Sequence, residues 1–392
     1  MENHLAMAGG RKMTNAKTSR RDFMVGVAGV AASPARCFGM VSGGGRYSVA
    51  VLGDTHYDAE PESVYHSHYD ESNKWAKVQH EEFRRNGEMW RDRCMRLLNA
   101  SAAAAYRSDA RFVLQLGDLV QGDCDDAPTH RKMLEDCVRL MRKPYPAGLP
   151  FLTVIGNHDF RGKGARNAYL DFVEPFIEEE IAKLADDGMR RPAKYPVFSF
   201  RLGGDLWVFC DFEMKNLDPV SDAIDADLGA RHVFLVTHGP FTTSPGGWGF
   251  RWRLGGRKES EASRVRLYET LSRRRAVVLS GHTHSTNFYR YANAHGGFSE
   301  FTVNSVWDLE PGRTATGPIE DGPPNYGAYG AARQKEKDLE DYKQETAFFR
   351  RDMKKYFFSR AAGHYRLDVT EESVQMSFYP GDARTPAWFV RL

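Results

Sequence analysis

The stretch VAVLGDTHYD, residues 49–58, begins as an apolar strand and ends in ionisable side chains. Its first four residues are typical of a buried strand, and a glycine, Asp54 and His56 follow directly. A carboxylate at the end of a buried strand is costly unless a positive charge compensates it. The end of this strand is therefore the first place to expect a binding or catalytic site.

Apolar runs typical of strands alternate with stretches of helical character along most of the chain. We expect strands at 47–52, 111–116, 151–155, 197–201, 206–210, 232–237 and 276–280, and helices at 88–107, 129–142, 165–185 and 259–273. Alternating strands and helices indicate an α/β fold in which a largely parallel sheet is buried.

After residue 285 strand follows strand, and a charged, helical stretch is expected at 335–355. We interpret residues 46–392 as one domain with insertions near 57–86 and 311–360. A C-terminal hairpin at 363–380 would complete a second sheet, and residues 1–45 would form an export signal and linker.

The distribution of charge separates the first 45 residues from the rest. They hold six basic and two acidic residues, a charge of +4, so that the remainder of a chain with net charge +2 carries −2. A nearly neutral body has no general attraction for polyanions, so no bulk nucleic-acid binding is expected.

The segment SRRDFMVGVAGVAAS, residues 19–33, places Arg20 and Arg21 before a short apolar stretch. That stretch is too short to span a bilayer, and the segment resembles a twin-arginine export signal. The resemblance implies a partner, the twin-arginine translocation machinery. It also implies cleavage within 32–45 and a periplasmic or secreted mature chain without a transmembrane helix. The alternative is a basic N-terminus that arose by chance.

Potential metal ligands follow the predicted strands one after another. They are Asp54, His56, Asp118, Asn157, His238, His282 and His284, with His158 beside them. In an open α/β sheet, sites form beyond the carboxyl ends of the strands. A crowd of carboxylates and imidazoles is unfavourable alone and becomes favourable around cations.

Two ions are expected rather than one. Seven ligands exceed what one ion uses, and a carboxylate can bridge two ions about 3.5–4 Å apart. A mixed oxygen and nitrogen set without thiolate suits Mn, Fe or Zn, and the residue types leave the choice open.

The order of these motifs resembles the calcineurin-like metallophosphoesterase superfamily over residues 46–310. The resemblance implies a four-layer α-β-β-α sandwich of two mixed sheets, with two metal ions at the C-terminal ends of the strands. Motif positions imply the following ligands: Asp54, His56 and His284 for one ion, Asn157, His238 and His282 for the other, and Asp118 as the bridge.

The resemblance also implies hydrolysis of a small-molecule phosphomonoester or phosphodiester by a metal-bridging hydroxide. His158 would lie outside the ligand shell and protonate or stabilise the leaving oxygen. Asp159 would either orient a neighbour or cap a helix. Two alternatives stay open: a non-catalytic binding scaffold with this fold, and a dinuclear hydrolase of another bond.

The motif GDLVQGD, residues 117–123, departs from two branches of the superfamily. Protein Ser/Thr phosphatases have Asp-Arg-Gly after the position of Val120, where this chain has Gln121 and Gly122. Specificity for phosphoproteins is therefore disfavoured. Gln121 also stands where purple acid phosphatases have a metal-bound tyrosine, so no tyrosinate colour is expected.

Two loops are the expected source of substrate specificity. The loop at 244–258 could present Arg251 or Arg253 to a phosphate, or could be a solvated basic loop. Aromatic residues of the segment 57–90 could cap the site or only pack that segment onto the domain. His66 and His68 imitate a ligand pair but do not follow a strand, so they are left out of the predicted site.

Overall fold

The computed structural model describes residues 45–59, 64–66, 74–186, 188, 196–247, 250–307 and 317–392, and side chains at 74–79 are not described. The predicted export signal and His68 lie outside these ranges. Within them, no helix has the length and apolarity needed to cross a bilayer.

A six-stranded mixed sheet contains the strand that precedes Asp54. Its strands are β1 (Tyr47–Leu52), β2 (Phe112–Gln115), β3 (Phe151–Thr153), β12 (Gly363–Val369), β13 (Val374–Pro380) and β14 (Trp388–Arg391), in the order β14-β13-β12-β1-β2-β3. The strands β1, β2 and β3 are parallel, and β12 pairs antiparallel with β1. The parallel strands deliver their carboxyl ends to one edge of the sheet.

The second sheet is eight-stranded and also mixed. Its strands are β4 (Val197–Leu202), β5 (Asp205–Cys210), β6 (Val233–Thr237), β7 (Val277–Ser280), β8 (Thr286–Tyr291), β9 (Ser299–Thr302), β10 (Glu320–Asp321) and β11 (Met353–Ser359), in the order β10-β11-β8-β9-β7-β6-β5-β4. A parallel group, β5-β6-β7-β9, lies between antiparallel edges.

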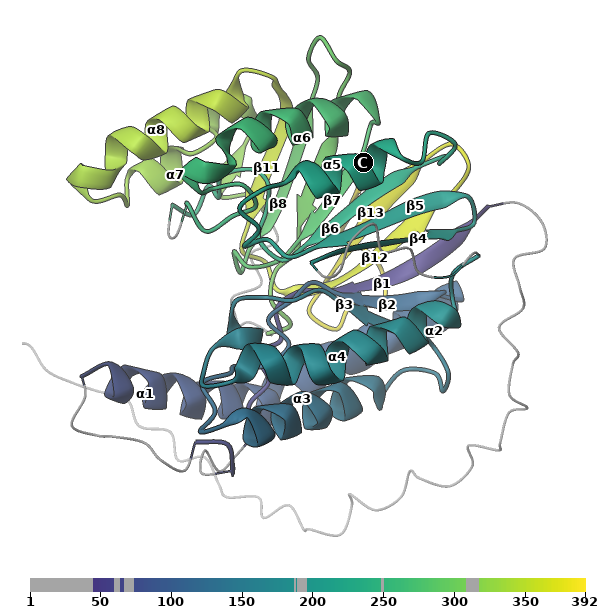
Figure 1. The fold of residues 1–392 in the computed structure, drawn as a ribbon, viewed down its shortest axis with the longest axis vertical. Helices are drawn as coiled ribbons and strands as arrows, with labels where there is room; N and C mark the ends of the chain where they lie inside the picture. The colour runs from purple at the N-terminus through teal and green to yellow at the C-terminus, as the bar shows by residue number, and fades with distance from the viewer. Residues whose placement is uncertain are drawn as a thin grey trace, which may run out of the picture. The chain divides into compact units, whose positions relative to one another are not determined.

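Helices cover the outer face of each sheet (Figure 1). Those on the side of the six-stranded sheet are α2 (Met95–Ser108), α3 (Ala127–Arg142) and α4 (Ala165–Ala182), with α1 (Lys74–Met89) beyond the end of the sheet, and those on the side of the eight-stranded sheet are α5 (Asp218–Asp225), α6 (Glu261–Arg273), α7 (Ala328–Ala331) and α8 (Glu336–Arg350). Short 3₁₀ turns occur at His158–Phe160, Lys258–Ser260 and Pro323–Asn325. The four-layer α-β-β-α sandwich predicted from the sequence is confirmed.

The two sheets face each other across a core of large aromatic side chains. Trp207 of β5 stacks on Phe234 of β6 with ring centroids 4.1 Å apart, and Phe112 of β2 meets the edge of the same indole at 5.1 Å. Tyr47 donates a hydrogen bond of 2.8 Å to Asp205 and accepts one of 3.1 Å from the Trp207 indole. Polar and apolar contacts thus tie the first strand of the chain to the opposite sheet.

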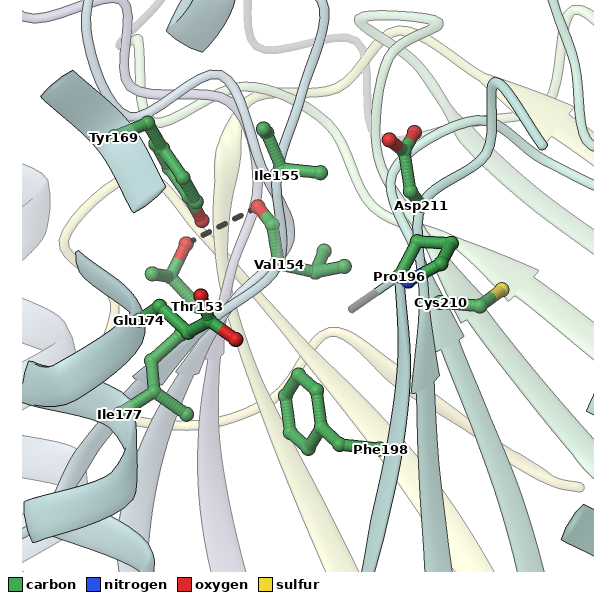
Figure 2. Close-up of a pocket in the computed structure, with 10 residues that line it drawn as sticks. All are labelled: Thr153, Val154, Ile155, Tyr169, Glu174, Ile177, Pro196, Phe198, Cys210 and Asp211. Carbon is green, nitrogen blue, oxygen red and sulfur yellow. Dashed lines mark hydrogen bonds between the residues drawn. The ribbon is translucent and has the colours of Figure 1, made fainter. Parts of the chain in front are cut away.

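A narrow cavity lies in the interior at one side of this core, between α4 with the end of β3 and the strands β4 and β5 (Figure 2). It is lined by Thr153, Val154, Ile155, Tyr169, Glu174, Ile177, Pro196, Phe198, Cys210 and Asp211. Its volume of about 20 Å³ is close to that of one water molecule. None of the predicted metal ligands lines this cavity, and a space of this volume is too small to hold a phosphoester substrate.

The C-terminal half departs from the sequence-based expectation in its strand partners. The hairpin at 363–380 joins β1 in the six-stranded sheet, where we expected it to complete a second sheet. The charged helix ends at Arg350, and β11 from the expected insertion 311–360 pairs with β8. Alternating polarity identifies a strand but carries no information about its partner, which is why the pairing was missed.

A helical segment in the N-terminal half begins earlier than predicted. One helix was expected at 88–107. The structure has three consecutive elements instead, without a break between them: α1, a π-helical turn at Trp90–Cys94 and α2. Part of the expected insertion at 57–86 is therefore the beginning of this helix.

The helix α8 is fastened to the loop that follows β6 by two ion pairs of different burial. Arg253 is 3% exposed and pairs with Glu345 of α8, which also lies 3.3 Å from Arg264. Arg251 and Asp341 form a second pair, and each side chain is about half exposed. The buried pair anchors the helix, because removing one partner would leave a charge inside the protein.

We predict that Glu345→Gln lowers the free energy of unfolding by about 3 kcal/mol, the cost of leaving a buried guanidinium without its carboxylate. Asp341→Asn is the matched control and should cost less than about 1 kcal/mol, because an exposed ion pair contributes little. Urea unfolding followed by circular dichroism measures both. Equal effects of the two substitutions would contradict the assignment of Arg253 and Glu345 as the anchor.

Candidate metal centre

Seven potential ligands from both sheets converge in the structure. Asp54 and His56 follow β1, Asp118 follows β2, Asn157 follows β3, His238 follows β6, and His282 and His284 follow β7. All seven predicted ligands are brought together, and most of them are buried. The convergence follows from the topology, because both parallel groups of strands end at the same side of the sandwich.

One group of ligand atoms consists of Asp54, His56 and His284. Nε2 of His284 lies 3.0 Å from Nε2 of His56 and 3.1 Å from Oδ2 of Asp54. Nε2 of His56 lies 3.8 Å from the same carboxylate oxygen. Two imidazole nitrogens and a carboxylate oxygen therefore face a common point, as ligands of a cation do.

A second group consists of Asp118, His238 and His282, and Asn157 adjoins it. Nε2 of His238 lies 3.2 Å from Oδ2 of Asp118, 3.1 Å from Nδ1 of His282 and 3.2 Å from Oδ1 of Asn157. The set again combines imidazole nitrogens with oxygen atoms and contains no thiolate. It is chemically suited to Mn, Fe or Zn.

The carboxylate of Asp118 lies between the two groups. Its Oδ2 is 3.2 Å from Nε2 of His238 and 3.6 Å from Nε2 of His56. A carboxylate so placed can bridge two ions. The buried Oδ2 of Asp54 makes no hydrogen bond within the described residues, an arrangement that a bound cation would satisfy. The residues present fit a pair of metal ions.

Hydrogen bonds behind the ligands fix the orientation of two imidazole rings. Nδ1 of His56 lies 3.1 Å from Oε1 of Gln121, which also accepts a 2.7 Å bond from Asn86. Nδ1 of His238 donates to the carbonyl oxygen of Leu116 at 2.7 Å. Both rings are thereby held with Nε2 toward the cluster, as outer hydrogen bonds do in metal sites.

The backbone is strained at four of the ligands. His56, Asp118, His282 and His284 have φ angles of 41°, 52°, 69° and 45°. Non-glycine residues rarely adopt this left-handed conformation, and such residues gather at functional sites when the surroundings hold them there. The strain is confined to the turns that carry these four residues, and each of these turns directly follows a strand.

Glycines next to the ligands are required by close packing. A Cβ atom on Gly281 would lie 2.4 Å from Oδ1 of Asp54, and one on Gly156 would lie 2.2 Å from Oδ1 of Asp118. These oxygens accept hydrogen bonds from the backbone nitrogens of His282 and His158, at 2.8 Å and 2.7 Å. Any side chain at either glycine would displace a carboxylate from the cluster.

The electrostatics of the cluster show how strongly its carboxylates favour positive charge. Burial alone would raise the pKa of Asp54, but His238, His284 and His56 hold it well below its usual value. Burial likewise opposes protonation of His238, yet Asp118 and Asp54 raise the pKa of this imidazole to about 10. Two buried carboxylates thus create a strongly negative potential where cations would bind.

His158, the predicted proton donor, lies against the cluster. Its ring meets the edge of the His56 ring at 4.3 Å between centroids, and His56, Asp118 and His158 form a third, overlapping group of potential ligands. Nδ1 of His158 lies 2.9 Å from the carbonyl oxygen of Gln121, and Nη1 of Arg161 lies 2.9 Å from both ring nitrogens. Burial, with His56 and Arg161, lowers the pKa of His158 well below its usual value despite Asp118. Its catalytic role stays a prediction.

Asp159 has a structural role. Its Oδ1 accepts a 3.1 Å hydrogen bond from the backbone of Val120, and its Oδ2 accepts one of 2.8 Å from the backbone of Gly156. This side chain therefore connects the turns that carry Asp118 and Asn157, rather than capping a helix.

Two residues support the cluster from behind: Asn86, which the sequence reasoning missed, and Trp90, one of the aromatic residues of 57–90 expected either to cap the site or to pack. The indole of Trp90, in the π-helical turn, donates a 2.9 Å hydrogen bond to the carbonyl oxygen of Thr55, next to His56. Asn86, one turn earlier, reaches Gln121 as described above. Single π-helical turns often occur near functional sites, but no sequence pattern announces one.

The two arginines proposed to bind phosphate both have protein partners. Arg253 donates to the carbonyl oxygens of Phe241 and Leu254 at 3.1 Å and 3.2 Å, in addition to its ion pair with Glu345. Arg251 pairs with Asp341. Their role toward a substrate stays a prediction, and Arg253 has an evident structural role instead.

Part of the chain is similar in sequence to a curated protein. Over 134 residues the chain is 32% identical to the DNA double-strand break repair protein Mre11 of Halobacterium salinarum, an alignment covering 34% of this chain and 29% of that protein. The chain thus spans about three-tenths of the length of this curated relative.

One solved structure resembles the chain in fold, and a second aligns with a lower score. A purple acid phosphatase from yellow lupin (Lupinus luteus) seeds aligns with a TM-score of 0.50 and 10% identity, over 88% of this chain and 53% of that one. A dimetal phosphatase from Danio rerio aligns with a TM-score of 0.44 and 12% identity, over 88% of this chain and 98% of that one.

The calcineurin-like phosphoesterase family is matched over residues 47–286, which is well over half of the 392 residues. The matched range begins with β1 and ends just beyond His284, so it contains all seven ligands. The chain belongs to the calcineurin-like phosphoesterase family.

Proposed function

We propose that this protein is an exported hydrolase of phosphomonoesters or phosphodiesters that works with two metal ions. The observation that carries the proposal is the pair of ligand groups joined by Asp118, whose Oδ2 lies within 3.6 Å of imidazole nitrogens from both groups. Family membership and the near-neutral net charge of the chain support a small phosphoester as the substrate.

The ions, when bound, would neutralise phosphoryl oxygens and lower the pKa of water. In this proposal Asp54, His56 and His284 hold one ion, and Asn157, His238 and His282 hold the other. The chain's own residues orient those ligands: Gln121 fixes the ring of His56, and the Leu116 carbonyl fixes the ring of His238. His158, beside Arg161 and the Gln121 carbonyl, would assist departure of the leaving oxygen.

We predict that the purified protein binds two metal ions per chain and that Mn²⁺ raises its melting temperature relative to EDTA. A ligand that binds only the folded state stabilises it, by about 2.7 kcal/mol at one hundred times its dissociation constant. Elemental analysis and thermal unfolding provide the two measurements. Asp118→Asn should reduce the metal content and abolish most of the stabilisation.

His66→Gln is the matched control for metal binding. His66 is buried 3.3 Å from the carboxylate of Asp58 but belongs to neither ligand group. The His66→Gln variant should retain both metal ions. A wild-type protein whose melting temperature is indifferent to Mn²⁺, Fe²⁺ and Zn²⁺ would contradict a dinuclear centre.

We predict metal-dependent turnover on a panel of p-nitrophenyl phosphate, its bis-ester, phenyl phosphate, cyclic nucleotides, glycerophosphodiesters and single-stranded DNA. The last substrate is included because of the similarity to a DNA repair protein. His158→Asn should reduce kcat at least tenfold more for phenyl phosphate than for p-nitrophenyl phosphate, because the poorer leaving group needs more assistance. Equal reductions would remove His158 from that role.

The panel also separates the alternatives. Two bound ions with no turnover on any phosphoester would favour a hydrolase of another bond. A protein that neither binds metal ions nor turns over any phosphoester would be better explained as a binding scaffold.

The proposal of export rests on residues 19–33 alone and has its own test. Replacing Arg20 and Arg21 together by lysine should retain the precursor in the cytoplasm, because the twin-arginine pair is the feature by which such a signal is read. Cell fractionation with an antibody to the mature chain measures this. Unchanged export of the double variant, with Lys12→Arg as a charge-neutral control, would refute the proposal.

A further inference from the structure

A cavity of about 220 Å³ opens beside the metal centre on the side of His282 and His284. It is lined by Pro240, Ser244, Gly246, Phe250, Trp252, Arg253, His282, Thr283, His284 and Arg360. Two potential metal ligands thus form one wall of the cavity. A substrate whose phosphoryl group lies at the ions could extend its leaving group into this space.

Apart from the two histidines, the ionisable side chains that line the cavity are both arginines, Arg253 and Arg360. No aspartate or glutamate is among the described residues that line it. Arg253 is already paired with Glu345, so Arg360 supplies the available charge. Arg360 is exposed, and among the described residues its guanidinium has no carboxylate partner. Its Cζ lies 5.3 Å from the centre of the Tyr329 ring, which supports the side chain without neutralising it.

An aromatic surface faces the same space. The indole of Trp252 is 55% exposed, which is unusual for so large an apolar side chain. Its ring lies nearly parallel to that of His282, at 6.4 Å between centroids and 23° between planes. A flat ring entering the cavity from solvent would cover apolar surface that Trp252 leaves exposed.

The walls of the cavity are held in place by the C-terminal segment. The hydroxyl of Tyr342 in α8 lies 3.2 Å from the carbonyl oxygen of Ser244, to which it donates, and its ring meets that of Phe250 at 5.4 Å. The hydroxyl of Tyr326 donates to the carbonyl oxygen of Thr243 at 2.7 Å. A cavity held in this way is formed before the substrate arrives, which lowers the entropic cost of binding.

We propose that this cavity is the leaving-group site and that it selects phosphoesters of an aromatic group bearing a second negative charge. Arg360 pairs with that second anion, and Trp252 stacks on the ring. This inference rests on the proposed phosphoesterase function. It assigns specificity to residues of the C-terminal half that lie outside the metal-binding motifs.

The test compares 4-carboxyphenyl phosphate with 4-carbamoylphenyl phosphate, which have the same shape and differ in one charge. The ratio of their kcat/KM values should fall about tenfold in Arg360→Gln relative to the wild-type holoenzyme. Arg333→Gln is the matched control. Arg333 contacts the same Tyr329 ring, at 3.4 Å, but does not line the cavity, so the ratio should be unchanged.

Calorimetric binding of the non-hydrolysable pair 4-carboxybenzylphosphonate and 4-carbamoylbenzylphosphonate gives a readout independent of turnover. Arg360→Gln should weaken binding of the carboxylate compound only, whereas Trp252→Leu should weaken binding of both compounds about equally.

If Arg360→Gln reduced kcat/KM for both substrates alike, Arg360 would contact the scissile phosphoryl group and the proposal would be wrong. An unchanged ratio would also overturn it. Absence of all phosphoester turnover would instead count against the proposed function, and the phosphonate pair would still test the cavity.

Discussion

The carboxylate of Asp118, buried between imidazoles of two strand ends, is the constraint on which the rest of the structure depends. Its negative charge and that of Asp54 are unfavourable in the interior unless cations compensate them. Both groups of parallel strands must end at one place for this to happen. The strained turns, the adjacent glycines and the hydrogen bonds behind His56 and His238 all serve to hold those ends together.

The parts of the molecule have separate tasks in this arrangement. The strands β1, β2, β3, β6 and β7 supply the potential ligands, and α1 with its π-helical turn braces the first of them through Trp90 and Asn86. The C-terminal segment supplies Arg360 of the cavity lining and α8, whose Tyr342 supports Ser244 and Phe250 of the opposite wall. Burial of Arg253 against Glu345 joins this segment to the loop after His238, and hence to the vicinity of the metal centre.

The sequence predicted what depends on local pattern. Strand ends that carry Asp-x-His or Gly-His-x-His could be read directly, and the α/β class followed from the order of elements. The four layers were implied by the resemblance to the calcineurin-like metallophosphoesterases. Long-range features were out of reach: nothing in residues 353–359 or 363–380 tells which strand each will pair with. Arg253 looked like a loop cation because its burial depends on α8, ninety residues later. Arg360 is one exposed arginine among many until the fold places it beside His284.

The attachment of α8 to the loop after β6 has a consequence for how such a molecule could diversify. The potential ligands all lie before residue 285, whereas Arg360 and the supports of the cavity lie after residue 320. Exchange of the later segment for another of similar packing would give the same hydrolytic apparatus a new preference. In our proposal the charge that selects the leaving group is thus encoded apart from the potential ligands, whereas the aromatic surface of Trp252 is encoded between them.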